Sequence, residues 1–151
     1  MDLSLPPEEI KQKALKKALD LLSLREHSSQ ELRQKLLIRE FPEMMIEEIL
    51  SHIAERGWQS DERFAESYVN MRIQGFYGPV KIRQELLERG VSKELIDHQL
   101  SLDQDEWIGL AQMARKKHFG DAMPETFKAR AKQMRFLQYR GFTTEQINRI
   151  F

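Results

Sequence analysis

Apolar residues recur along this chain at intervals of three and four, the spacing that places them on one face of an α-helix. In the segment 10–22 the apolar positions that share a face are Ile10, Ala14, Leu15, Ala18, Leu19, Leu21 and Leu22. Lysines and Asp20 occupy the opposite face. Residues 45–53 repeat the pattern, and no stretch alternates apolar and polar residues for long enough to predict a strand. The pattern therefore predicts an all-α protein.

Glycines and prolines divide this pattern into short helices. Gly57, Gly90 and Gly141 each follow an arginine and precede a large apolar residue. That order is typical of a helix end, where glycine adopts the left-handed conformation and the next residue packs back. Prolines lie at or near three predicted helix starts, at Pro42, Pro79 and Pro124. Five hydroxyl residues are expected to be N-caps: Ser28, Ser29, Ser60, Ser92 and Thr143.

The chain also resembles itself at a fixed offset. A shift of 50 residues places 32–36 on 82–86 without a gap, and a further shift of 51 places 86–92 on 137–143. Arginine and glutamine recur at polar positions that helical packing does not constrain, so chance similarity is the weaker interpretation. We predict three three-helix repeats, with approximate spans of 8–57, 58–102 and 103–151, that form an elongated, curved array.

The composition excludes several classes of protein. Leucine occurs 18 times and valine only 3 times, which agrees with helices rather than strands. The absence of cysteine excludes disulfides, thiol catalysis and cysteine-ligated metals. No apolar run is long enough to span a membrane, and the first residues lack the features of a signal peptide. The sequence predicts a soluble cytoplasmic protein.

Residues that could carry catalysis are scattered. The four histidines, which are His27, His52, His98 and His118, share no metal-ligand spacing. The chain has no phosphate-binding glycine loop and no motif that pairs a nucleophile with a base. We therefore expect no enzymatic activity, no cofactor and no metal.

Charge is balanced in total but not along the chain. The 24 basic and 24 acidic residues give a net charge of zero, which rules out a uniformly basic nucleic-acid binder. Residues 40–62 contain seven acids and one base, whereas 115–140 contain eight bases and two acids. The basic stretch could meet phosphate groups or an acidic protein surface. Tyr77 and Tyr139 are the aromatics that we expect to be exposed.

The loop 75–79 combines two glycines, two aromatics and a proline. One interpretation is a tight turn between helices that plugs an aromatic side chain into the core. The other is a turn that displays Tyr77, Lys81 and Arg83 to a partner. Both interpretations stay open at this point.

Four motifs resemble the RecX family and occur in the order found in that family. They are REHSSQEL at 25–32, DERFA at 61–65, GFYGPVKIRQEL at 75–86 and FLQYRGF at 136–142. The resemblance runs from about residue 10 to the end. It implies three tandem three-helix repeats and a non-enzymatic bacterial regulator of recombinational DNA repair and the SOS response.

The resemblance also implies a partner. Family members bind the filament of the RecA recombinase on DNA, in its helical groove, and limit its growth, ATP hydrolysis, strand exchange and assisted repressor cleavage. Many members are basic and bind DNA weakly. Because this chain has a net charge of zero, we expect it to bind DNA weakly or through RecA. We also expect a monomer with no membrane partner.

Two alternatives remain, a DNA-binding helical module and a general helical adaptor protein. The expected partner- or nucleic-acid-binding residues are Tyr77, Lys81, Arg83, Arg89, Lys116, Lys117, Lys128, Arg130, Lys132, Arg135 and Arg140. We expect most of the bases to form one strip. Lys128 and Lys132 share a helix face, whereas Arg130 lies on another side, so about half of the set is expected to matter.

Overall fold

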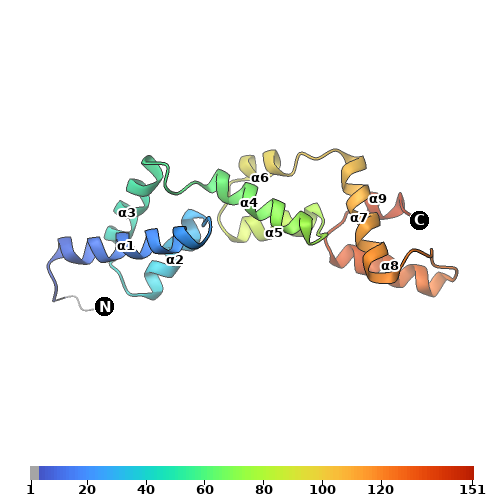
Figure 1. The fold of residues 1–151 in the computed structure, drawn as a ribbon, viewed down its shortest axis with the longest axis horizontal. Coiled ribbons are helices and arrows are strands. Elements are labelled where there is room, and N and C mark those ends of the chain that lie inside the picture. The colour runs from blue at the N-terminus through green and yellow to red at the C-terminus, as the bar shows by residue number, and fades with distance from the viewer. Residues whose placement is uncertain (1–3) are drawn as a thin grey trace. The chain divides into compact units, whose positions relative to one another are not determined.

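The computed structural model describes residues 4–151, and within them the chain forms nine helices and no strand (Figure 1). The helices are α1 (Pro7–Leu24), α2 (Ser29–Ile38), α3 (Glu43–Glu55), α4 (Asp61–Gln74), α5 (Pro79–Glu88), α6 (Lys93–Gln99), α7 (Gln104–Phe119), α8 (Phe127–Tyr139) and α9 (Thr144–Asn148). The all-α prediction is confirmed. Among residues 4–151, no helix combines the length and the apolar character needed to cross a membrane.

The positions that match under the repeat offset are core positions. Leu36, Leu86 and Leu137 are all fully buried. The isoleucines at the next matched position are also buried: Ile46, Ile96 and Ile147. Nine helices with equivalent buried positions agree with three three-helix repeats. The spans 8–57, 58–102 and 103–151 stay a prediction.

Most predicted helix ends are confirmed. Side-chain oxygens of Ser28, Ser92 and Thr143 accept backbone hydrogen bonds as N-caps, and Gly57, Gly90 and Gly141 all have positive φ. Ser29 was expected to be an N-cap, but this is wrong because α2 already begins at Ser29.

Helix α7 begins at Gln104 because a capping box fixes its start. A side-chain oxygen of Asp103 accepts a hydrogen bond from the backbone N–H of Glu106, and Oε1 of Glu106 accepts one from the backbone N–H of Asp103.

The chain divides into two compact units. The N-terminal unit contains the residues up to Ser67 together with Arg89–Val91, and the C-terminal unit contains Tyr68–Glu88 and Ser92–Phe151. In the N-terminal unit, α1, α2 and α3 pack on one another around a buried apolar cluster that includes Ile10, Leu32 and Ile53. In the C-terminal unit, α7, α8 and α9 pack on one another, and α5 packs on α6.

Candidate partner and nucleic-acid interface

Helix α8 presents a stripe of three bases and one aromatic. Lys128, Lys132, Arg135 and Tyr139 follow one another at intervals of four, three and four, which places them on a single helix face. All four side chains are exposed, Tyr139 by 77%. The opposite face is fixed by burial of Leu137, so the stripe must point outward. We call these four residues the α8 stripe.

Lys81 of α5 extends the α8 stripe. Its Nζ atom lies 4.4 Å from the centroid of the Tyr139 ring, within reach of a cation–π interaction. Residue 81 and the α8 stripe belong to the same compact unit. The structure thus brings together Lys81 with the predicted bases of α8, although nearly 50 residues of sequence separate them.

The bases of the stripe carry uncompensated charge. Within residues 4–151, no ion pair engages Lys128, Lys132 or Arg135. Arg83, in contrast, forms an ion pair with Asp97, and Nη1 lies 2.6 Å from the carboxylate oxygen. A free cation on an exposed helix face can neutralise an acidic partner, whereas a paired one must first break its own contact.

The remaining predicted bases lie apart from the stripe. The guanidinium of Arg130 lies over the Phe151 ring, 5.7 Å from its centroid, on another side of α8 as its position in the sequence indicated. Lys116 is exposed on α7. Arg89 belongs to the N-terminal unit, where its Nε lies 3.9 Å from a carboxylate oxygen of Glu31.

The loop 75–79 holds Tyr77 among neighbouring cations. The half-buried Tyr77 ring lies between two guanidinium groups, 4.4 Å from Arg72 and 4.6 Å from Arg140. Arg140 also donates a 2.8 Å hydrogen bond from Nη1 to the carbonyl oxygen of Gly75. The expected exposure of Tyr77 is therefore wrong, because neighbouring cations cover the ring.

Arg72 is itself fixed in place. Arg72 forms a bidentate ion pair with Glu85 of α5. Hydrogen bonding to Glu85 is the main reason that the pKa of the Arg72 guanidinium is raised above its usual value. The ion pair thus fixes the guanidinium of Arg72, which lies over the Tyr77 ring, on helix α4.

A cavity of about 210 Å³ lies beside this loop. Its lining residues are Gly75, Phe76, Ala114, Lys117, His118, Phe136 and Arg140. His118 stacks on Phe136 with ring centroids 4.1 Å apart, and Lys117 Nζ lies 5.0 Å from the Phe76 centroid. Two of the predicted bases, Lys117 and Arg140, therefore line the same cavity as the rings of Phe76, His118 and Phe136.

One base of the basic stretch is part of the core. Arg115 is only 2% exposed, and its guanidinium donates to the carbonyl oxygens of Gly120, Asp121 and Ala122 and to Oε1 of Gln133. It holds the loop after α7 rather than facing solvent. The number of basic residues in 115–140 could not predict this, because it does not say which of their side chains are buried.

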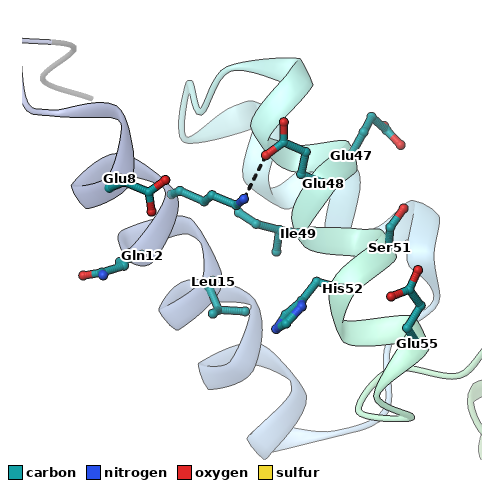
Figure 2. A pocket seen from close by; sticks show the side chains of 10 residues that line it. Glu8, Gln12, Leu15, Glu47, Glu48, Ile49, Ser51, His52 and Glu55 are labelled. Atoms are coloured by element: carbon teal, nitrogen blue, oxygen red, sulfur yellow. Dashed lines mark ion pairs between the residues drawn. The ribbon is translucent and has the colours of Figure 1, made fainter.

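The N-terminal unit has a groove that sequence analysis also missed. It lies between α1 and α3 and has a volume of about 630 Å³ (Figure 2). The lining residues are Glu8, Lys11, Gln12, Leu15, Glu47, Glu48, Ile49, Ser51, His52 and Glu55. We call this the acidic groove. The groove is formed by residues of two helices that are about 40 positions apart in the sequence. No local sequence motif therefore predicts it.

No arrangement in the described part of the chain resembles a metal site. Over residues 4–151, no group of three or more histidine, aspartate or glutamate side chains could hold a metal ion. The geometry instead offers exposed cations, aromatic rings and a groove, which are features suited to binding.

Comparison with protein families gives three adjacent matches. The model described as "RecX, first three-helix domain" matches residues 14–52, the second three-helix domain matches 60–100, and the third matches 104–151. Together they cover most of the chain and follow the order of the helices.

Curated proteins and solved structures agree with these matches. Over 133 residues the chain is 39% identical to "Regulatory protein RecX" of Pseudomonas entomophila, which covers 88% of this chain and 86% of that protein. It is 40% identical over 139 residues to the protein of the same name from Legionella pneumophila, with 92% and 93% covered. The crystal structure of RecX from Lactobacillus salivarius has a TM-score of 0.80 at 22% identity, covering 95% of each chain, and so supports the fold.

Proposed function

The chain belongs to the RecX family, and on that premise we propose that it binds the filament of the RecA recombinase on DNA and limits the growth and activities of that filament. The activities concerned are ATP hydrolysis, strand exchange and assisted repressor cleavage. The protein would act in recombinational repair and the SOS response, in the cytoplasm. It would do so by binding, without catalytic turnover of its own.

The observation that supports this function best is the α8 stripe together with Lys81. The stripe offers three cations without ion-pair partners in the described part of the chain, and an exposed tyrosine beside them. A filament on DNA presents phosphate groups, and exposed cations beside an aromatic ring suit phosphates and stacked bases. The stripe is therefore our proposed filament-facing surface.

The charge layout favours action on the filament over tight binding to free DNA. The chain has a net charge of zero, so long-range attraction to DNA is weak outside the basic stretch. We infer that contact with RecA supplies part of the binding free energy, and that the DNA contact is local.

A titration on labelled single-stranded DNA, with and without RecA, tests the proposal. We expect weak binding to DNA alone and tight, saturable binding when RecA coats the DNA, together with lower ATP hydrolysis by RecA. Tight binding to bare DNA that RecA does not change would identify a DNA-binding module instead. Binding to neither would leave only an adaptor for another partner.

A further inference from the structure

In place of the monomer expected from the sequence, we propose that the acidic groove between α1 and α3 docks helix α8 of a second copy of this chain. The two surfaces belong to different compact units. They complement each other in charge and in apolar character.

The acidic groove has an apolar floor and a glutamate rim. Its floor is the half-buried Leu15 of α1, which packs over the buried Ile49 of α3. Four glutamates line the groove: Glu8, Glu47, Glu48 and Glu55 (Figure 2). Its volume of about 630 Å³ lies within the usual range of ligand pockets, about 300–1,000 Å³. Such a groove suits a side chain with an apolar body that is flanked by cations.

Part of the glutamate charge is not compensated within the unit. Glu48 pairs with Lys11 at 2.9 Å, and Glu47 pairs with Arg33 of α2 at 2.6 Å. Over residues 4–151, neither Glu8 nor Glu55 takes part in an ion pair. A cation that enters at either end of the groove can therefore meet the carboxylate of Glu8 or that of Glu55 without displacing an ion pair of that residue.

Helix α8 carries the matching chemistry. Phe127 at its start is 89% exposed, which leaves a large ring without cover. Lys128 follows it directly, and Lys132 lies one turn further on, with no ion-pair partner for either in the described residues. Phe127 can cover the half-buried Leu15 while the two lysines meet the glutamate rim.

The compact units also have opposite charge as wholes. The N-terminal unit contains 14 acids and 11 bases, and the C-terminal unit contains 10 acids and 13 bases. Attraction between unlike units of two copies therefore adds to the local contact, and salt should screen it. Because the groove and α8 are different surfaces, the association is head-to-tail and can continue beyond a dimer.

This association would compete with the function proposed above, because α8 is used in both. That consequence rests on the proposed function, whereas self-association itself does not. We therefore test it on the full chain alone, without RecA and without DNA.

The experiment is sedimentation velocity over a range of protein concentrations, at about 50 mM and about 500 mM salt, where the Debye length falls severalfold. We expect concentration-dependent association at low salt and monomers at high salt. The double variant Glu8→Lys/Glu55→Lys should weaken association at least about tenfold. Glu62→Lys/Glu66→Lys is the matched control, because it changes exposed glutamates of α4 by the same charge outside the groove. It should associate nearly as well as the unchanged chain.

A charge exchange between copies makes the test specific. The variant Lys128→Glu/Lys132→Glu should be monomeric alone, and mixing it with Glu8→Lys/Glu55→Lys should restore association because an acidic helix then meets a basic groove. Phe127→Ala should also weaken association, although it changes no charge. Circular dichroism spectra should show that every variant is folded.

Three results would overturn the proposal. The first is a chain that stays monomeric at low salt up to the highest soluble concentration. The second is a control variant that weakens association as much as the groove variant, since the attraction would then be unspecific. The third is a folded Lys128→Glu/Lys132→Glu variant that associates as well as the unchanged chain, since α8 would then lie outside the contact.

Discussion

The backbone N–H of Gly78 donates a 2.8 Å hydrogen bond to the carbonyl oxygen of Arg140. The hydroxyl of Ser28 donates an equivalent bond, also 2.8 Å long, to the carbonyl oxygen of Arg89. Residue 78 follows residue 28 by 50 positions, and residue 140 follows residue 89 by 51. A hydrogen bond to the matching carbonyl oxygen therefore recurs at the repeat offset, donated by a backbone N–H at Gly78 and by a side-chain hydroxyl at Ser28.

Close approach explains why glycine stands at this contact. Gly141 has a φ of 98°, and a Cβ atom on it would crowd the backbone nitrogen and Cβ of Lys81. At the corresponding position of the first repeat, Glu40 has a φ of 66° with a side chain present. The left-handed conformation alone thus does not require glycine, but the approach of Lys81 does.

We predict that Gly78→Ala loosens this contact. A Cβ atom at residue 78 would lie 2.5 Å from the backbone of Gly141, so either the loop or the helix end must move. We expect a loss of about 1–3 kcal/mol in the free energy of unfolding, measured with urea. Gly109→Ala in α7 is the control, since nothing lies within 4 Å of its Cβ position, and helix propensity should make it neutral or stabilising by up to about 1 kcal/mol. Equal stability of the two variants would contradict the close-contact explanation.

A second prediction tests the repeat core. Leu86 is fully buried, whereas its neighbour Leu87 is 47% exposed. Leu86→Ala should destabilise the protein by about 2–5 kcal/mol because it leaves a cavity, and Leu87→Ala should cost less than about 1 kcal/mol. Thermal or urea unfolding of both variants measures the difference. Similar losses for the two would argue against Leu86 as a core position.

The fold could be predicted well from the sequence because helical periodicity and the offsets of 50 and 51 both identify buried positions. Leu36, Leu86 and Leu137 match because each must fill the core of its repeat. The functional surface was predicted only in part, since a linear charge count cannot separate a buried base from an exposed one. Arg115 and Lys132 look alike in the sequence, yet the first bonds loop carbonyls and the second faces solvent.

Contacts between distant segments were harder still to predict. Tyr77 was expected to be exposed, but Arg140 covers one side of it from 63 positions away in the sequence. The acidic groove escaped notice for the same reason, because α1 and α3 each supply one wall. Helical periodicity predicts which face of a helix is buried, but it does not predict which pairs of helices will have a groove between them.

A third prediction concerns the pH dependence of stability. His27 is buried, and burial is the main cause that lowers the pKa of its imidazole. Nε2 lies 3.2 Å from the Lys35 ammonium, which can only donate, so Nδ1 carries the proton and donates to the carbonyl oxygen of Arg25 at 3.0 Å. The folded state therefore holds this histidine neutral.

The sign of the effect follows from proton binding. Above a pH of about 6.5 the imidazole is neutral in both states, and below it the unfolded state takes up the proton first. Stability should fall as pH drops below about 6.5, with a slope of at most about 1.4 kcal/mol per pH unit from this group. Urea unfolding at several pH values between about 7.5 and 5.5 measures this slope, and His27→Gln should flatten it. An unchanged slope in the variant would show that another group causes the dependence.

The most direct test of the proposed function replaces Lys128, Lys132 and Arg135 by glutamate together and measures inhibition of RecA ATP hydrolysis on single-stranded DNA. We predict that the folded triple variant loses most of its inhibition. The matched control Lys13→Glu/Arg39→Glu/Lys93→Glu changes two lysines and one arginine that are exposed and outside α8, and that also have no ion pair within residues 4–151. It should inhibit nearly as well as the unchanged chain. Full inhibition by the folded α8 variant would contradict the account and move the filament-facing surface to the acidic N-terminal unit.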